Sequence, residues 1–367
     1  MNGLVLTHIG IEDVSAEEIK KLISASDVKV DKGKIFFSCK SDQDLVELCY
    51  HGRTFTKVVL LLSAGTMKEM PDENLLKDFK QFIDKTAVVK CERTGKHDFT
   101  SFDVEQVLNS ALVKLYGVQI DHKNPQTTFF LLIEDEKYYL GVDFAGIDLG
   151  RRDYRIFLGT DALKGNIAAS LLSIVEYDPK HALLDPFCRH GIIPIEAAIY
   201  ATNTSPHKFA KEKLAFSKLP NLKFNLKDKE TEFKGTIIAM DDNFKHVSAA
   251  KKNAKIAGVV KSIEFSRADM QWLDAKFGKN FLDRIIALPV QAGRSISDKT
   301  VEKIYHQFFY QSEFILKKSG KICICMKRGV DLLKTKAAEF KFSIESERKV
   351  MQGQEELTIL VFSKSIA

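Results

Sequence analysis

From about residue 166 onward, the chain alternates between short apolar runs and longer segments with helical spacing. The helical segments are 167–175, 192–201, 244–257 and 298–316, and the strand-like runs are 182–185, 236–240, 262–266, 284–288 and 321–326. Parallel neighbouring strands need a crossover between them, and a helix usually supplies it. This order therefore predicts an α/β domain with a parallel, doubly wound sheet. Two last runs, 340–345 and 357–362, are typical of an antiparallel hairpin at its edge.

Acidic residues directly follow the first three strands of this predicted sheet. They are Asp185, Asp241 and Asp269. Ligands of doubly wound sheets bind at the carboxyl ends of the strands, so these side chains are candidates for a nucleotide site. A carboxylate at position 241 can accept two hydrogen bonds from a ribose, and residues 269–270 can read an adenine. Each aspartate can instead cap a turn or a helix, and both interpretations stay open.

The first 150 residues indicate two smaller α+β units. Residues 1–60 hold strand-like runs at 4–9 and 34–38 and helical runs at 15–23 and 42–49. Residues 61–150 hold a strand at 87–92, a helix at 101–115 and a hairpin around 134–137. Residues 151–165 are polar and basic, which is typical of a linker. We therefore predict four parts, with boundaries at 1–60, 61–150, 151–165 and 166–367.

Composition adds limited constraints on function. The formal net charge of +6 permits a polyanionic partner but does not demand one. The six cysteines are scattered without metal-binding spacing, which predicts no metal and a reduced, cytoplasmic environment. No apolar run reaches the ~18 residues of a membrane span, so we expect no membrane association.

Residues 185–198 read DPFCRHGIIPIEAA and resemble the block DPFCGSGTIPIEAA of the THUMP-domain RNA methyltransferases. That family includes N2-guanine methyltransferases of tRNA and ribosomal RNA. Further similar segments follow in family order at 93–99 (RTGKHDF), 118–125, 142–155, 162–164 and 213–220. Together they cover roughly residues 60–362, and their combination is specific for common ancestry.

The resemblance implies a ferredoxin-like α+β domain, then a THUMP domain, then a Rossmann-like methyltransferase domain. It implies S-adenosylmethionine as the cofactor and a guanine N2 amine of tRNA as the target, with Pro289 and Gln291 lining the base pocket. The THUMP domain would dock the acceptor stem and 3′ end of the tRNA. The residues expected to hold the cofactor are Asp185, Phe187, Gly191, Asp241, Asp269 and Met270.

Two loops depart from the family pattern. The family's Gly-Ser-Gly is Arg189-His190-Gly191 here, and Arg189 could pair with the cofactor's carboxylate or fill its pocket. The family's N/D-P-P-Y is Leu288-Pro289-Val290-Gln291, and a leucine side chain cannot accept a hydrogen bond from the target amine. Alternative functions are therefore an inactive, tRNA-binding paralogue and a subunit that borrows its active site from a protein partner.

Basic residues around the matched segments are candidates for RNA contacts, because they can neutralise phosphates. The insert 206–234 combines eight lysines with four phenylalanines, and its phenylalanines could stack on bases or pack into the core. The candidates are Arg93, Lys96, His97, Lys123, Arg151, Arg152, Arg155, Lys213 and Lys218.

Overall fold

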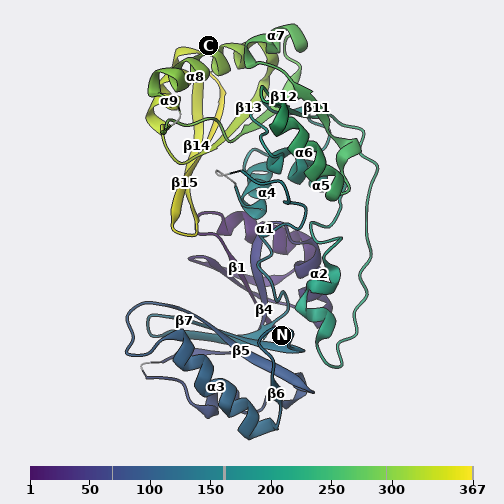
Figure 1. Cartoon of the computed structure of the whole chain (residues 1–367), viewed down its shortest axis with the longest axis vertical. Helices are drawn as coiled ribbons and strands as arrows, with labels where there is room; N and C mark the ends of the chain where they lie inside the picture. The colour runs from purple at the N-terminus through teal and green to yellow at the C-terminus, as the bar shows by residue number, and fades with distance from the viewer. Residues whose placement is uncertain (68, 160–162, 295, 366–367) are drawn as a thin grey trace. The chain divides into compact units, whose positions relative to one another are not determined.

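A computed structural model describes residues 1–67, 69–159, 163–294 and 296–365. It divides the chain into two compact units (Figure 1). The N-terminal unit consists of residues 1–7, 16–149 and 210–227, and the C-terminal unit of residues 8–15, 150–209 and 228–367. Residues 160–162, in the predicted linker, lie outside the described residues. The four-part division predicted from the sequence stays a prediction.

The N-terminal unit is built on one eight-stranded sheet of order β2-β3-β1-β4-β8-β7-β5-β6. The strand β4 pairs antiparallel with both β1 and β8, so the predicted boundary at residue 60 falls inside a strand shared by both halves. The predicted hairpin around residues 134–137 is confirmed as β7 and β8. The strands are β1 (Asn2–Thr7), β2 (Ser26–Asp31), β3 (Lys34–Ser38), β4 (Phe55–Thr66), β5 (Thr86–Thr94), β6 (Gln119–Ile120), β7 (Thr127–Glu134) and β8 (Lys137–Asp143).

Helix α3 (Ser101–Tyr116) shows how local sequence fixes an element of this unit. Thr100 and Asp103 form a reciprocal capping box at its start, and Gly117 ends it in a left-handed conformation, φ 64°. Its residues Val104, Leu108 and Leu112 are fully buried in the core beneath the sheet. The other helices of the N-terminal half are α1 (Glu12–Ile23) and α2 (Asp42–His51).

The middle of the lysine-rich insert belongs to the N-terminal unit. The backbone N–H groups of Ala215 and Phe216 donate to the carbonyl oxygens of Ala145 and Phe144, at 3.0 Å each. Phe216 is fully buried, and the ring of Phe224 contacts it edge-on with centroids 5.0 Å apart. These two phenylalanines therefore pack into the core, as one of the two interpretations predicted.

The C-terminal unit confirms the predicted parallel, doubly wound sheet with an antiparallel edge. Its strand order is β11-β10-β9-β12-β13-β15-β14. Strands β9 to β13 pair in parallel, whereas β15 and β14 form the antiparallel hairpin. The strands are β9 (Leu183–Asp185), β10 (Ile237–Asp241), β11 (Glu264–Arg267), β12 (Leu282–Ala287), β13 (Leu316–Met326), β14 (Phe342–Gln352) and β15 (Glu355–Lys364).

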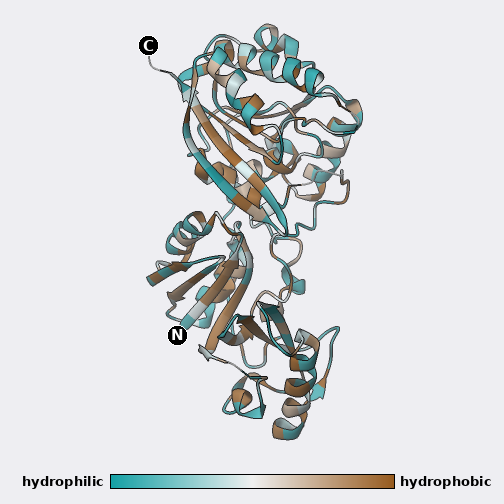
Figure 2. Ribbon diagram, turned by 90° about the vertical axis from the view of Figure 1, so that its left-hand side faces the viewer, coloured by the Kyte–Doolittle hydropathy of each residue, from teal (hydrophilic) through white to brown (hydrophobic). Residues whose placement is uncertain are grey.

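Helices cover both faces of this sheet, and the strands alternate between two apolar clusters. Cys323 and Cys325 of β13 face the cluster with α4, α5 and α6, whereas Ile322 and Ile324 face the cluster with α8 and α9. Figure 2 shows the hydrophobic residues concentrated along the central strands. The helices are α4 (Gly165–Ile174), α5 (Ile192–Ala201), α6 (Phe244–Ile256), α7 (Leu273–Lys276), α8 (Asp298–Ile315) and α9 (Val330–Glu339), of which α7 and α9 are not predicted from the sequence.

The chain leaves β9 toward β10 and β11 on one side and later returns to β12 on the other. The carboxyl ends of β9, β10 and β12 therefore surround the topological switch point, where sheets of this class bind ligands. In the described part of the chain, no helix combines the length and hydropathy needed to cross a bilayer. The described residues also contain no group of three or more side chains arranged to hold a metal.

Candidate active site

The loop between β9 and α5 is held by buried polar contacts. The Asp185 side chain is 1% exposed, and its Oδ1 accepts the backbone N–H of Phe187 at 3.1 Å. Burial raises the pKa of the Asp185 carboxyl well above its ordinary value. The backbone N–H of Cys188 donates to the carbonyl oxygen of Met240, which ties the loop to the neighbouring strand. Asp185 therefore shapes the loop at the base of the site.

Two residues of this loop adopt the left-handed backbone conformation. Gly191 has φ 84°, and a Cβ there would lie 2.9 Å from the Cβ of Ala250 in α6. Only glycine avoids both the strain and this clash. Arg189 has φ 45°, which a non-glycine residue adopts only at an energetic cost. The loop thus keeps a glycine-type backbone at position 189 although it carries a long side chain there.

Asp241 lies at the end of β10 and binds three protein donors. Its Oδ2 accepts the backbone N–H of Arg189 at 2.9 Å. Its Oδ1 accepts the N–H of Asn243 at 3.0 Å and contacts Nδ1 of His246 at 2.9 Å. The side chain of Asp242 also interacts with Asp241, and burial together with this neighbouring carboxylate raises the pKa of Asp242. The sequence pattern did not single out His246.

Asp269 fits the helix-cap interpretation. Its Oδ1 accepts the backbone N–H of Gln271 at the start of the short 3₁₀ helix Met270–Trp272. It nevertheless lines the same cavity as Asp241. The two roles are compatible because the cap uses one carboxylate oxygen at 2.9 Å, whereas the other oxygen accepts the longer hydrogen bond of the Gln271 side-chain amide at 3.3 Å.

A large cavity opens at the carboxyl ends of β10 and β11, with a volume of about 650 Å³. Four of the six predicted cofactor residues line it: Phe187, Asp241, Asp269 and Met270. Val290 and residues of α8 complete the wall. This volume lies within the range of pockets that hold small organic ligands, roughly 300–1,000 Å³.

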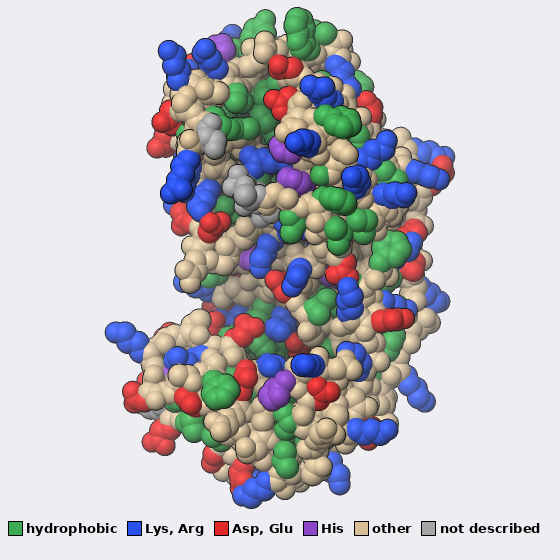
Figure 3. Space-filling model, in the orientation of Figure 1, with side chains coloured by type: hydrophobic (Ala, Val, Ile, Leu, Met, Phe, Trp, Pro, Cys, Tyr) green, Lys and Arg blue, Asp and Glu red, His purple; other side chains and the backbone are tan. Residues whose placement is uncertain are grey.

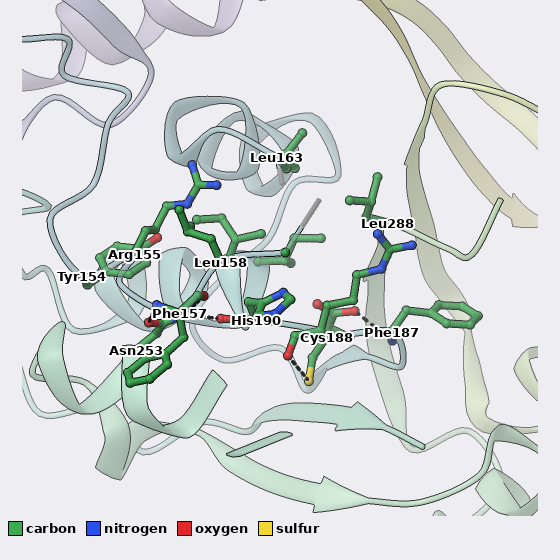
Figure 4. Close-up of a pocket in the computed structure, with 15 residues that line it drawn as sticks. Tyr154, Arg155, Phe157, Leu158, Leu163, Phe187, Cys188, His190, Asn253 and Leu288 are labelled. Atoms are coloured by element: carbon green, nitrogen blue, oxygen red, sulfur yellow. Dashed lines mark hydrogen bonds between the residues drawn. The ribbon is translucent and has the colours of Figure 1, made fainter. Parts of the chain in front are cut away.

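A second, much smaller cavity lies on the other side of Arg189, with a volume of about 30 Å³. Asp185, Cys188 and His190 line it; they belong to residues 185–191, which connect β9 to α5 and which we call the motif loop. Figure 4 shows Leu158, Leu163 and Leu288 around the same space. Phe187 and Arg189 line both cavities. A water molecule needs roughly 10–15 Å³ of such space, so this cavity holds only a few atoms.

The end of β12 offers few polar groups to a substrate. Leu288 is apolar and 9% exposed. The carbonyl oxygen of Pro289 accepts a hydrogen bond from Nη2 of Arg189 at 3.3 Å. Gln291 turns toward β13, where its Oε1 accepts the backbone N–H groups of Lys327 and Arg328 at 2.9 and 2.8 Å. Of the two predicted catalytic residues, the structure places the Pro289 carbonyl at the site and directs the Gln291 amide away from both cavities.

Two known families match the chain. Residues 152–358 match the family described as RMKL-like, methyltransferase domain, and residues 66–143 match the THUMP domain. The chain belongs to the RMKL-like methyltransferase family. Both assignments confirm the resemblance found in the sequence and the predicted fold class. S-adenosylmethionine is the cofactor of this class of methyltransferase.

The sequence matches to relatives cover almost the whole chain. The tRNA (guanine(6)-N2)-methyltransferase of Methanocaldococcus jannaschii is 29% identical over 96% of this chain and 97% of its own length. The enzyme of the same name from Thermus thermophilus is 27% identical over 95% of both chains. The crystal structure of TrmN from Thermus thermophilus matches with a TM-score of 0.75 at 24% identity, covering 99% of both chains, which supports the fold.

A further solved structure shares the fold of this RMKL-like protein. SMU.472, complexed with SAH, matches with a TM-score of 0.81 at 18% identity over 100% of this chain and 98% of that chain. At this identity the likeness concerns the fold, so the fit of a cofactor must be judged from the residues of the RMKL-like protein itself.

The residues of this RMKL-like chain fit one half of S-adenosylmethionine and not the other. The large cavity has the size, apolar walls and carboxylates that an adenosine group needs. The amino-acid tail, with its carboxylate, amine and two methylenes, is larger than the small cavity of about 30 Å³ beyond Arg189. A tail that extends past Arg189 therefore has no room in the small cavity.

The candidate RNA residues fall into different environments. In the THUMP region, Lys96 and His97 line a surface hollow of about 470 Å³, and Nδ1 of His97 contacts Nη1 of Arg93 at 2.8 Å. Lys123 and Lys213 are exposed, and Nζ of Lys218 donates to Oδ1 of Asn124. Basic and acidic side chains are interspersed on the face shown in Figure 3, so charge alone does not outline an RNA site there.

Arg152 differs from the other candidates because it lies in the core. Its Nε and Nη2 donate to the two carboxylate oxygens of Glu196 at 2.8 and 3.1 Å, and neither side chain is exposed. Arg151 remains exposed and Arg155 is half-buried beside the small cavity. The segment predicted as a polar linker is thus anchored in the C-terminal unit, and Arg152 cannot reach a phosphate from this position.

Proposed function

We propose that the protein binds tRNA and that its target group is the N2 amine of a guanine. The observation that carries this proposal is the end-to-end match with two enzymes named tRNA (guanine(6)-N2)-methyltransferase, which spans 95–97% of each relative. A match of this extent retains the order of the THUMP domain and the methyltransferase domain. We also propose that the protein acts in the cytoplasm, where tRNA is used.

The THUMP domain is the proposed docking site for the acceptor stem and 3′ end. Lys96 and His97 line a hollow that also includes Gly95 and three acidic residues, Asp98, Asp135 and Glu136. Both ring nitrogens of His97 contact protein groups, Nδ1 with Nη1 of Arg93 and Nε2 with the carbonyl oxygen of Asp135. The proposed phosphate contacts therefore rest on the cations Lys96 and Arg93, since phosphate contacts supply most of the affinity in nonspecific RNA binding. Lys123 and Lys213 are exposed, and they are further proposed RNA contacts. Arg152 is not a proposed contact, because it is buried against Glu196.

A second candidate function is tRNA binding without methyl transfer. It is favoured because the residues at the end of β12 leave few hydrogen-bond acceptors available to a substrate amine. Leu288 offers no acceptor to an amine, the Pro289 carbonyl is bound by Arg189, and the Gln291 amide is bound to β13. Loss of a single positioned hydrogen-bonding group at an active site reduces kcat by about 10²–10³-fold. A subunit that completes its site with a protein partner is a variant of this candidate.

The test combines binding and chemistry on the same purified chain. Gel shift with a tRNA transcript and with its isolated acceptor stem measures docking, and mass spectrometry of the tRNA nucleosides after incubation with S-adenosylmethionine measures N2-methylguanosine. Binding with product supports the enzyme, and binding without product supports the non-catalytic candidate. Absence of tRNA binding even in dilute salt would overturn both. Co-purification from cells identifies a partner subunit.

A further inference from the structure

We infer that the large cavity binds an adenine nucleoside without an amino-acid tail, because the side chain of Arg189 closes the space that the methionine part of S-adenosylmethionine would occupy. The inference rests on the methyltransferase fold and not on the RNA target. It assigns to this chain a ligand preference that differs from that of its family.

The large cavity offers the groups that an adenosine needs. Phe187, Met270 and Val290 supply apolar walls for a purine ring. Asp241 and Asp242 lie side by side at the end of β10, where a ribose would present its hydroxyls. Asp241 is held in place by three hydrogen bonds from the protein, so its carboxylate is already oriented.

Arg189 separates this cavity from the small one, and hydrogen bonds fix it at both ends. Its backbone N–H donates to Asp241 at the end of β10, and its Nη2 donates to the Pro289 carbonyl at the end of β12. The side chain therefore extends from one strand end toward the other. It lines both cavities, and the small cavity beyond it measures about 30 Å³. A tail that leaves the ribose in this direction meets the arginine.

The charges of S-adenosylmethionine act in opposite directions at Arg189, because the guanidinium attracts the carboxylate of the tail and repels the sulfonium. The guanidinium of Arg189 is permanently positive, and the sulfonium of S-adenosylmethionine also carries a positive charge. Like charges at short range repel, and a partly buried site screens them poorly. S-adenosylhomocysteine has a neutral sulfur and nearly the same size. Comparison of the two compounds therefore separates the effect of charge from the effect of volume.

The experiment is isothermal titration calorimetry of the full chain without RNA, using adenosine, S-adenosylmethionine and S-adenosylhomocysteine as separate ligands. For the unmodified protein we expect adenosine to bind and S-adenosylmethionine to bind no more tightly than adenosine. For Arg189→Gly we expect the affinity for S-adenosylmethionine to rise at least ~10-fold, which is about 1.4 kcal/mol, with the adenosine affinity unchanged.

Two further variants provide a second test and a control. Arg189→Asn shortens the side chain and tolerates the left-handed backbone, so it should reproduce the gain even if the glycine variant folds poorly. Lys341→Gly is the matched control, because Lys341 has φ 61° and lines neither cavity. Glycine at position 341 also relieves the strain of a left-handed backbone. This variant should leave the affinities for adenosine, S-adenosylmethionine and S-adenosylhomocysteine unchanged.

Three results would overturn the inference. One is binding of S-adenosylmethionine to the unmodified protein at least ~10-fold more tightly than adenosine. Another is absence of a gain in both Arg189 variants, and the third is absence of adenosine binding. None of these results bears on tRNA binding, which is measured separately by gel shift. The ligand inference and the proposed function can therefore fail independently.

Discussion

The guanidinium of Arg152 and the carboxylate of Glu196 form a bidentate ion pair in the interior of the C-terminal unit, with N–O distances of 2.8 and 3.1 Å. The hydroxyl of Tyr154 donates to the same carboxylate at 2.6 Å. Glu196 lies on α5, the helix that begins directly after the motif loop. The segment before the methyltransferase fold is thereby fixed to the helix that positions that loop.

Replacement of Arg152 by alanine should destabilise the protein by about 3–5 kcal/mol, because it leaves the buried Glu196 carboxylate without its cation. Urea denaturation followed by circular dichroism measures this change. Arg151→Ala is the matched control, since Arg151 is exposed and its loss should change stability by less than about 0.5 kcal/mol. Equal effects of the two substitutions would contradict the structural role of the pair.

His207 should make the protein less stable in acid. Burial, reinforced by the nearby Arg152, holds the pKa of His207 well below 6.5 in the folded state. As the pH falls below about 6.5, the unfolded chain binds a proton at this position and the folded chain does not. The free energy of unfolding therefore falls with decreasing pH, by up to about 1.4 kcal/mol per unit.

The measurement for His207 is urea denaturation at pH 7.5 and 5.5 for the unmodified protein and for His207→Gln. Other titrating groups are common to both proteins, so the difference between them isolates the contribution of His207. We expect a smaller loss of stability in acid for His207→Gln. An identical loss in both proteins would show that His207 is not responsible.

Gln291 should affect stability and not RNA binding. Its Oε1 accepts two backbone N–H groups at the end of β13, so Gln291→Leu should cost about 0.5–1.5 kcal/mol per lost hydrogen bond. Gln291→Glu retains an acceptor oxygen and serves as the control with an unchanged fold. A base-contacting role would instead appear as weaker tRNA binding of Gln291→Leu with unchanged stability.

Lys96 should contribute an electrostatic contact to tRNA. If it neutralises one phosphate, Lys96→Ala should reduce the slope of log affinity against log salt concentration by about 0.7–0.9. Lys21→Ala removes an exposed lysine of α1 and should leave the slope unchanged. Gel shifts between low and physiological salt provide both slopes, and an unaltered slope for Lys96→Ala would exclude the contact.

Several features of the fold follow from local sequence. The alternation of apolar runs and helical spacing predicted the parallel sheet and its antiparallel edge. Short apolar runs are typical of buried strands, and apolar residues at helical spacing are typical of amphipathic helices. The aspartates at 185, 241 and 269 were placed correctly at the strand ends, since parallel strands bring their carboxyl ends to one edge. The elements α7 and α9 were missed: α7 spans only four residues, and α9 begins at a left-handed Gly329 without a capping side chain.

The sequence by itself thus determined the class of sheet, the THUMP match and the residue types at both chemical loops. Only the tertiary structure decided the direction of their side chains: Arg152 toward Glu196, Gln291 toward β13, and Arg189 toward the Pro289 carbonyl. The physical reason is that periodicity reports which face of an element is buried, whereas the partner of a polar group depends on which distant segment reaches it. In these three cases the partners lie 36 to 100 positions away in the chain.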